Sequence, residues 1–445
     1  MDVPRDPHLL PQELDLVISR SYGPGRYDAE YEEGGTDYPY GHVRWTEGRN
    51  MQAFLESVAR GRTKATELIT HRFPIAEAED AYRIVSGERQ EPHIGIVLTY
   101  PEEISRQDAI ALKPIAAQAK SGVVRISFAG AGSFARSYLL PHLKDKPGVE
   151  LVSVATAKGY TAVDAAKKFG FAEAASDAAA VCADPRVDAV FIATRHDHHA
   201  SLAQRALAAG KHLFVEKPLS IDMAGLAALL PVAEASGRIV QTGFNRRFSP
   251  LAVKLRQTLA ASATPVQITY RVNAGPLPAD HWLLHPEQGG GRMIGEGCHF
   301  VDLMQFLTNE LPARVTASRF GDDATGSLTV LIEFAGGSVG VLVYQANASP
   351  NVPKERIEAF SGGRGGIIDD WRSVDLMDGR KTKKVTASGQ AKGYAEEIAA
   401  FLASIRSGQP AISLQSQALT TICTFAAIES WTTRRPVDVT LPPRS

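Results

Sequence analysis

The stretch "VVRISFAGAGSFA", Val123 to Ala135, joins a short apolar run to a glycine-rich turn. Gly130, Gly132 and Ala135 stand in a G-x-G-x-x-A spacing, directly after the apolar run and at the start of a helical pattern. The first glycine permits a tight turn, the second lets a pyrophosphate approach the backbone, and a small third residue lets strand and helix pack closely. The stretch therefore predicts a dinucleotide-binding turn whose contacts are Gly130, Gly132, Ser133, Phe134 and Ala135.

The chain beyond this turn alternates short apolar runs with alanine-rich helical stretches up to about Asn245. The runs occupy residues 149–156, 187–194, 212–218 and 239–245. A strand that is apolar throughout is buried on both faces, whereas a half-exposed strand alternates polar and apolar residues. Residues 121–245 are therefore predicted to form a Rossmann domain, a doubly wound parallel sheet covered by helices on both faces.

The rhythm changes after Asn245 to longer β-rich runs such as "PVQITYRVNAG". The sequence "FAGGSVGV" predicts two strands joined by a Gly-Gly turn, which is a hairpin of an antiparallel sheet. Two helices follow, and the first places Ile398, Phe401, Leu402 and Ile405 on one face. Residues 246–445 are predicted to form an α+β domain with a large, mainly antiparallel sheet faced on one side by helices.

Composition limits the classes of partner. The chain has 445 residues, 44% of them hydrophobic and 22% charged, with a formal net charge of -1, which is typical of a soluble globular protein without a field that attracts nucleic acid or anionic membranes. The three cysteines, Cys182, Cys298 and Cys423, support neither a disulfide framework nor a zinc cage. We see no signal peptide and no apolar run of about 18 residues, so we expect a cytoplasmic protein that binds a small molecule.

The end of the second predicted strand bears on the choice of cofactor. NAD-binding domains usually place an acidic residue there to hold the ribose hydroxyls. Here Thr156 takes that place and Lys158 follows two residues later. Both can accept a 2′-phosphate, by hydrogen bond and by charge. The pattern favours NADP over NAD; the alternative is that Lys158 is an ordinary solvated lysine.

Several motifs appear in an order that resembles the glucose-fructose oxidoreductase, inositol dehydrogenase and rhizopine-catabolism family (Gfo/Idh/MocA), from residue 121 to about 440. They are "EKP" at Glu216 to Pro218, "TRHDHH" from Thr194 to His199, "FNRRFSP", "HPEQGGG" and "HFVD". The resemblance implies an NAD(P)-dependent oxidoreductase of sugars or cyclitols, working as a homo-oligomer, either dimer or tetramer. It also implies cofactor contacts by Thr194, His199, Glu216 and Lys217, and a cis peptide before Pro218.

Two residues fit the chemistry of hydride transfer. Lys217 follows a central strand, where open α/β sheets place their ligands, and its ammonium can hydrogen-bond the reacting oxygen. His299 can accept the hydroxyl proton as the hydride leaves. Many members of the Gfo/Idh/MocA family, which this chain resembles, have an aspartate four residues before this histidine. This chain has Gly295 there. Glu296 lies three residues before His299. It can replace the missing aspartate, or it can serve as a helix-opening acid.

The remaining polar residues have weaker signals. Asp302 is expected to orient the helix or the histidine rather than to react. A metal site is not expected in "IGEGCHFVD" or in "HDHH", where Asp197 is predicted to cap a helix. Further candidates for substrate contact are Asn245, Arg246, Arg247, Trp282 and His285, although salt bridges and core packing explain them nearly as well.

Residues 1–120 are expected to form a separate segment with a different resemblance, which includes a linker at "EEISRQDAIALKPIAAQAKSG". The segment from "ISRSYGPGRYDAEYEEGG" to "GIVLTY" resembles the carboxyl end of a zinc-type medium-chain alcohol dehydrogenase, without that enzyme's zinc ligands and nucleotide turn. We expect a remnant of a fused two-enzyme polypeptide, retained without its own active site; either Met1 is the true start or the chain is part of a longer fused enzyme. Together with Gly295, this segment leaves open an alternative function, that of a non-catalytic nucleotide-binding sensor or scaffold.

Overall fold

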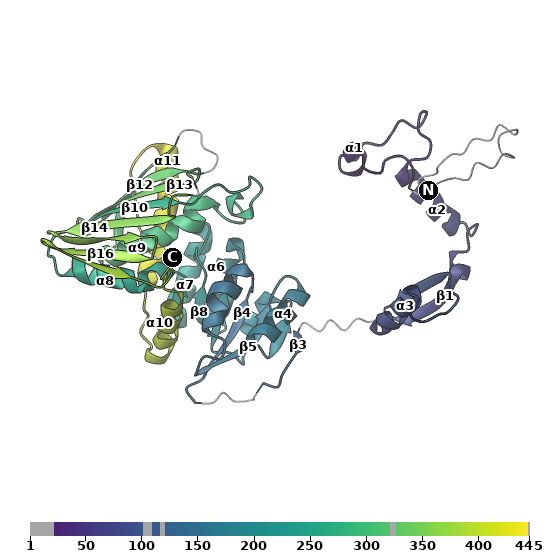
Figure 1. Ribbon diagram of the computed structural model, residues 1–445, viewed down its shortest axis with the longest axis horizontal. Helices are drawn as coiled ribbons and strands as arrows, with labels where there is room; N and C mark the ends of the chain where they lie inside the picture. Colours follow the sequence, from purple (N-terminus) through teal and green to yellow (C-terminus); the bar gives the residue numbers. More distant parts are fainter. Residues whose placement is uncertain (1–21, 101–108, 116–120, 321–325, 350, 444–445) are drawn as a thin grey trace. The chain divides into compact units, whose positions relative to one another are not determined.

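The structure is a computed structural model that describes residues 22–100, 109–115, 121–320, 326–349 and 351–443. It contains two compact units, Met1–Arg106 and Gln107–Ser445 (Figure 1). The first 21 residues and most of the expected linker lie outside the described residues. Three residues of the expected linker do lie in the described ranges and form β3 (Ala109–Ala111), which pairs with a strand of the second unit. This part of the chain is therefore a sheet edge rather than a free spacer.

The first unit is small and thinly packed. Its elements are α1 (Ala29–Glu32), α2 (Glu47–Ala59), β1 (Ile69–Pro74), α3 (Ala78–Val85) and β2 (Gly95–Thr99), with short 3₁₀ turns at Ala65–Leu68 and Ile75–Glu77. β1 and β2 pair in parallel, and α3 connects them while burying Ala81 and Ile84. Many large apolar side chains stay exposed, among them Trp45, Phe54, Leu55, Tyr82 and Ile94.

The second unit begins with the predicted Rossmann sheet, which the structure confirms. Seven strands lie in the order β3-β6-β5-β4-β7-β8-β9, all parallel except β3. The strands are β4 (Val124–Ala129), β5 (Val149–Ala155), β6 (Glu173–Ala175), β7 (Ala189–Ile192), β8 (His212–Val215) and β9 (Val240–Thr242). The covering helices are α4 (Gly159–Phe169), α5 (Ala178–Ala183), α6 (His199–Ala208) and α7 (Met223–Ser236). Sequence reasoning missed β6, because three residues are too few to show a pattern.

The helix after the glycine-rich turn is irregular. A π-helical turn spans Ala135–Leu139 and a 3₁₀ turn spans Leu140–His142. Pro141 explains the change, because proline has no backbone N–H to continue the i→i−4 ladder. The first turn still begins directly after Gly132, so its free N–H groups face the place where a phosphate would lie.

A nine-stranded, mainly antiparallel sheet follows, as predicted. Its order is β17-β16-β15-β14-β10-β13-β12-β11-β18. The strands are β10 (Gln267–Asn273), β11 (Pro312–Arg319), β12 (Leu328–Phe334), β13 (Val339–Gln345), β14 (Glu355–Ser361), β15 (Arg364–Asp369), β16 (Ser373–Asp378), β17 (Lys381–Thr386) and β18 (Val437–Asp438). β12 and β13 form the hairpin expected from "FAGGSVGV". Helices α8 (Pro250–Ala260), α9 (Cys298–Thr308) and α11 (Leu414–Thr433) pack together and against one face of this sheet.

Helix α10 (Tyr394–Ser407) differs from the expectation that both closing helices cover this second sheet. Its predicted apolar face is correct, since Ile398, Phe401 and Leu402 are fully or almost fully buried. However, the Phe401 ring meets Phe191 of β7 and Phe214 of β8 edge-on, with ring centroids 5.4 and 5.6 Å away. The helix thus returns to the Rossmann part and covers it, as its position beside β8 in Figure 1 shows. Which sheet a helix covers depends on the course of the chain and not on the helix's own periodicity.

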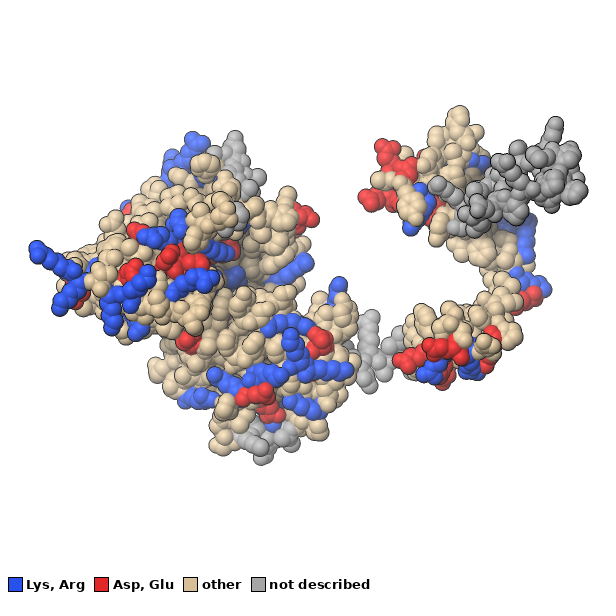
Figure 2. Space-filling model, in the orientation of Figure 1, with Lys and Arg blue, Asp and Glu red and all other residues tan. Residues whose placement is uncertain are grey.

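Charged side chains of both signs are interspersed over the visible face of the second unit (Figure 2). This mixture agrees with the formal net charge of -1. Within the described part of the chain, no helix combines the length and the apolar character that crossing a membrane requires.

Candidate active site

The glycine-rich turn has the geometry that the motif predicts. Gly130 has a φ of +95°, and a Cβ built on it would lie 2.5 Å from the carbonyl oxygen of Ala193. Only glycine fits this position, because both the backbone angle and the close approach of β7 exclude a side chain. A Cβ on Gly132 would meet nothing within 4 Å. The turn is therefore tight on one side and open on the other, and it can accommodate a pyrophosphate.

Residues at the end of β5 are held by local hydrogen bonds. The hydroxyl of Thr156 donates to the carbonyl oxygen of Lys158 at 2.7 Å and lies 2.6 Å from the hydroxyl of Thr161. Lys158 is exposed just before α4. The guanidinium of Arg136 joins the glycine-rich turn to α4, since it donates to the carbonyl oxygens of Ala131 and Thr161. These contacts fix the shape of the loop in which a ribose would lie.

Lys217 lies just beyond β8, at the carboxyl edge of the parallel sheet. Its ammonium donates a hydrogen bond of 2.9 Å to the carbonyl oxygen of Gly295. The peptide bond between Lys217 and Pro218 is cis, as the resemblance implied. The hydrogen bond brings "EKP" and "IGEGCHFVD" together, although 78 residues separate the bonded pair.

Glu216, the first residue of "EKP", points towards Gly243. A Cβ on Gly243 would lie 2.8 Å from a carboxylate oxygen of Glu216, so glycine leaves room for this side chain. Burial raises the pKa of Glu216 to about 7, against an opposing effect of Lys217. The carboxyl of Glu397 on α10 is also buried. Burial and the charge of Glu216 raise the pKa of Glu397 well above its usual value.

His199 is fully buried and serves as a connector. Its Nδ1 lies 2.8 Å from the carbonyl oxygen of Pro218, and its Nε2 lies 3.3 Å from that of Thr194. Burial lowers the pKa of His199 to about 4. The side chain ties the end of β7 to the cis-proline turn after β8. The expected contact between His199 and a cofactor is therefore indirect, because the ring has no exposed atom to offer.

His299 is almost completely buried near the start of α9. Its Nδ1 is buried without a hydrogen-bond partner among the described residues, which leaves Nε2 as the nitrogen available to a ligand. Burial, Arg246 and Lys217 hold the pKa of His299 well below its usual range. The ring is therefore neutral near neutral pH, which is the state in which it can accept a proton.

Glu296 lies in a π-helical turn, Met293–Gly297, that precedes α9. The hydroxyl of Tyr344 on β13 donates a short hydrogen bond to its carboxylate, and the ammonium of Lys354 lies 3.5 Å away. Burial raises the pKa of Glu296, but Lys354 and Tyr344 outweigh burial and leave that pKa below its usual value. The wider π turn changes the register between Glu296 and His299, so the spacing argument for a regular α-helix does not apply here.

The two arginines proposed for substrate contact are engaged elsewhere. Arg246 makes two hydrogen bonds of 2.8 Å to the fully buried carboxylate of Glu355. Arg247 bonds both carboxylate oxygens of Asp302 in α9, at 2.9 and 3.1 Å. Their charges are thus compensated inside the protein, which favours the salt-bridge alternative, and substrate contact by either arginine stays a prediction. From sequence, the partners could not be found, because Glu355 lies more than a hundred residues away from Arg246.

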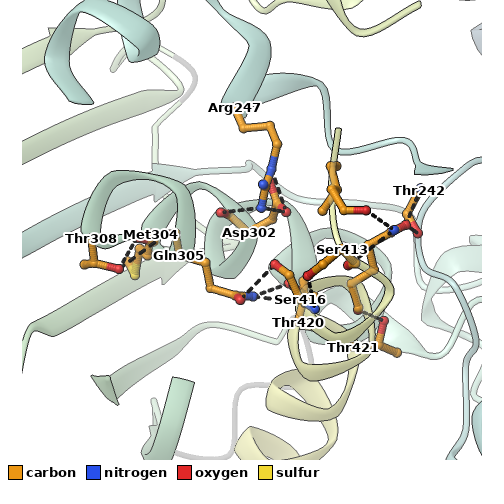
Figure 3. Close-up of polar contacts among 12 residues, drawn as sticks. Thr242, Arg247, Asp302, Met304, Gln305, Thr308, Ser413, Ser416, Thr420 and Thr421 are labelled. Atoms are coloured by element: carbon orange, nitrogen blue, oxygen red, sulfur yellow. Dashed lines mark hydrogen bonds and ion pairs between the residues drawn. The ribbon is translucent and has the colours of Figure 1, made fainter. Parts of the chain in front are cut away.

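Helix α9 is anchored by polar contacts to Arg247 and to α11. Figure 3 shows Asp302 facing Arg247, and Gln305 facing Ser416 and Thr420 of α11. The hydroxyl of Ser416 donates to Gln305 at 3.1 Å. Asp302 therefore orients the helix, as expected, and fixes the position from which His299 projects.

The other candidate residues differ in their burial and in their hydrogen-bond partners. Asn245 is buried and donates to the carbonyl oxygen of Lys392 at 2.8 Å. Trp282 is half-buried, His285 is exposed, and Thr194 donates to the carbonyl oxygen of Arg195. Asp197 does not cap α6, because His198 is the N-cap residue and makes no side-chain cap bond.

Sequence reasoning missed His196, which lies next to this site. Its ring stands edge-on to Trp282, with centroids 4.8 Å apart. A Cβ on Gly295 would lie 3.0 Å from Cε1 of His196 and 2.5 Å from Cδ1 of Leu283. A side chain at position 295 would thus crowd both neighbours. Within "HDHH", sequence reasoning assigned roles to Asp197 and His199 but none to His196, and no group of three potential metal ligands occurs among the described residues.

Comparisons with known proteins identify the family of this chain. Residues 124–244 match a family model described as an oxidoreductase family with an NAD-binding Rossmann fold. Residues 263–367 match the GFO/IDH/MocA C-terminal domain. The chain belongs to the Gfo/Idh/MocA family. Its N-terminal unit lies outside both matches.

Relatives of this Gfo/Idh/MocA protein extend the comparison. The chain is 28% identical over 340 residues to inositol 2-dehydrogenase of Rhizobium meliloti, a match that covers 71% of this chain and 99% of the relative. It is 27% identical to myo-inositol 2-dehydrogenase of Thermotoga maritima, over 61% of this chain and 86% of the relative. A solved structure of a putative myo-inositol dehydrogenase from Sinorhizobium meliloti is 26% identical, with a TM-score of 0.59 over 72% of this chain and all of that chain.

The enzyme class predicted from the motifs is confirmed by this membership. This Gfo/Idh/MocA protein is an oxidoreductase with an NAD-binding Rossmann domain. The alternative, a non-catalytic nucleotide-binding sensor or scaffold, gains no support.

Proposed function

We propose that this oxidoreductase transfers hydride between a nicotinamide cofactor and a secondary alcohol or ketone of a sugar, a sugar derivative or a cyclitol. The observation that carries the proposal is the hydrogen bond from Lys217 to the carbonyl oxygen of Gly295, four residues before His299. In support, the ammonium of Lys217 lies at the carboxyl edge of the parallel sheet and contacts the segment that carries the neutral imidazole of His299. The relatives named as inositol dehydrogenases favour a polyol as the substrate.

The described residues divide the work of the reaction. When bound, the nicotinamide supplies the hydride acceptor or donor. Lys217 hydrogen-bonds the reacting oxygen and stabilises the negative charge that develops on it. His299 takes the hydroxyl proton on Nε2 during oxidation and returns it during reduction. Thr194, Glu216 and the residues of the glycine-rich turn remain proposed cofactor contacts, and Glu296 remains a proposed partner of the reaction through its charge.

Steady-state turnover tests this assignment. A panel of sugars and cyclitols is assayed with NAD⁺ and NADP⁺, using wild type, Lys217→Ala and His299→Ala. Each variant is expected to lose at least about 10²-fold in kcat, with cofactor affinity retained. The matched controls are Lys254→Ala and His198→Ala, which change exposed side chains and should keep wild-type turnover. Wild-type turnover in Lys217→Ala or His299→Ala would refute the assigned roles.

A preference for NADP over NAD is also proposed. Thr156 and the exposed Lys158 stand at the end of β5, in a segment without a carboxylate, so a 2′-phosphate would meet a cation and no repelling acid. The affinities of both cofactors are measured for wild type, Lys158→Ala and the control Lys167→Ala on α4. Lys158→Ala should weaken NADP⁺ binding by about 10-fold and leave NAD⁺ binding nearly unchanged. A clear NAD⁺ preference that survives Lys158→Ala would reject the idea.

A homo-oligomer, dimer or tetramer, is proposed from the second sheet. The outward positions of β13, Val339, Val341 and Val343, are only half-buried in the single chain. A row of valines on an outer sheet face is suited to a partner sheet. Light scattering should give twice or four times the monomer mass, and a monomer at micromolar concentration would exclude the proposal. A cytoplasmic location is kept as a proposal and fits the three buried free cysteines.

The N-terminal unit is proposed to be a remnant of a medium-chain dehydrogenase. Its parallel β1-α3-β2 arrangement and its exposed Trp45, Phe54 and Leu55 are suited to a segment that once packed on a larger core. Genomic sequence tests the idea: an open reading frame that continues upstream in frame and carries the zinc ligands would support it, and a stop codon just before Met1 would refute it.

A further inference from the structure

His196 lies in a 3₁₀ turn, His196–His198, that follows β7 at the carboxyl edge of the sheet. Its Nδ1 is 2.9 Å from the carbonyl oxygen of Gly289. A carbonyl can only accept, so Nδ1 carries the proton. Burial and the charge of Lys217 lower the pKa of His196 to about 3, which keeps the ring neutral. The Nε2 lone pair is therefore a hydrogen-bond acceptor.

The surroundings of Nε2 distinguish this ring from a core histidine. Both nitrogens of His199 have carbonyl partners. In His196, Nε2 has no hydrogen-bond partner among the described residues. It is also not one of the fully buried polar atoms that lack a partner there. It is thus open to solvent, while the rest of the ring is covered and held by Trp282 on one side.

The ring also borders the peptide that Lys217 contacts. Cε1 of His196 would lie 3.0 Å from a Cβ on Gly295, and the carbonyl oxygen of Gly295 accepts from Lys217. Burial and the charge of Lys217 lower the pKa of His196, and burial, Arg246 and Lys217 lower that of His299. The Gly295 peptide thus connects the ring of His196 to the ammonium of Lys217.

We infer that His196 is a second substrate-contacting residue, whose Nε2 accepts a hydrogen bond from the hydroxyl next to the carbon that is oxidised. The inference rests on the proposed function and narrows its substrate to vicinal diols. Lys217 and His299 engage the reacting oxygen, and His196 engages its neighbour. Trp282 covers the His196 ring and can also stack on an apolar face of the substrate ring. A side chain at position 295 would press on the ring of His196, so the glycine gives this ring its room.

Two variants separate the contact from the fold. In His196→Asn, the amide nitrogen can keep the bond to the carbonyl oxygen of Gly289, but Nε2 is lost. In His196→Gln, the longer amide can place its oxygen where Nε2 was. Melting temperature and cofactor affinity are measured for both, and both are expected to stay at wild-type values.

The decisive readout is kcat/KM on paired substrates: myo-inositol with its 1-deoxy analogue, and D-glucose with 2-deoxy-D-glucose. His196→Asn should lose about 10- to 100-fold on the parent polyol and less than about 3-fold on its deoxy analogue, because the analogue lacks the hydroxyl that His196 binds. His196→Gln should recover part of the loss on the parent. Equal losses on parent and analogue, or a parallel loss of cofactor affinity, would overturn the inference alone. Absence of wild-type turnover on both parents and on the full sugar and cyclitol panel would overturn the proposed function, and this inference with it.

Discussion

Burial lowers the pKa of three histidines at the candidate site. His196, His199 and His299 all have a pKa below the usual value, with burial as the first cause in each case. Each one favours the neutral ring in the folded protein, whereas the unfolded chain binds protons near pH 6.5. The unfolded state therefore takes up more protons as the pH falls, and stability decreases. The same neutrality makes His299 a base and His196 an acceptor.

The pH dependence of unfolding tests this view at His199. The folded pKa is about 4, so the stabilisation of the wild type is present above pH 6.5 and is lost as the pH falls towards 4. We expect the difference in unfolding free energy between wild type and His199→Gln to shrink by about 3 kcal/mol between pH 7 and pH 4. Urea unfolding at a series of pH values measures it. A difference that stays constant over this range would contradict the assignment.

At this scale, sequence reasoning gave the proposed reacting groups but not the partners of the charged residues near them. Lys217 and His299 stand in motifs, and the structure brings their segments together. Arg246 and Arg247 also stand in a motif, yet their guanidinium groups bind Glu355 and Asp302. A motif gives the residue and its neighbours in the chain. The partner of a buried charge is set by the tertiary fold, which no local spacing encodes.

For helices and turns too, local sequence predicts the element itself but not its tertiary contacts. The apolar face of α10 was predictable from its period, but its contact with the Rossmann strands was not. The π turn before α9 was not predictable either, because "MIGEG" has no distinctive composition, and it changes where Glu296 points. Its place next to the reactive histidine agrees with the frequent occurrence of π turns at functional sites.

The role of α10 as a cover for the Rossmann strands gives a stability prediction. Phe401 is fully buried between two phenylalanine rings of β7 and β8. Phe401→Ala should lower the free energy of unfolding by about 3 to 5 kcal/mol, because it removes apolar burial and leaves a cavity. The control on the same helix is the exposed Glu396→Ala, expected within about 0.5 kcal/mol of wild type. Equal unfolding midpoints for the two variants would show that α10 does not stabilise the Rossmann part.

At the scale of the whole molecule, all candidate site residues belong to the second unit, Gln107–Ser445. The sequence predicted both of its sheets because the strand patterns are strong: continuous apolar runs in one and a Gly-Gly hairpin in the other. It did not predict β3, which came from the expected linker. Short edge strands form by backbone pairing, which leaves little trace in side-chain type.

Removal of the first unit is expected to leave the chemistry intact. A chain of residues 107–445 should keep kcat/KM within about 3-fold of the full chain, since the second unit has its own core and contains the site. Steady-state assays of both chains, at equal folded concentration judged by circular dichroism, measure the ratio. A loss above 10-fold in a folded truncated chain would mean that the first unit contributes to the site.

The central claim is that the ammonium of Lys217 acts on the reacting oxygen during hydride transfer. Its most direct test is the single-turnover rate of Lys217→Ala, followed by the absorbance of the reduced nicotinamide with saturating cofactor and substrate. We predict a rate at least about 10²-fold below that of wild type, with a cofactor dissociation constant that changes by less than about 3-fold. A single-turnover rate equal to that of wild type would contradict the account.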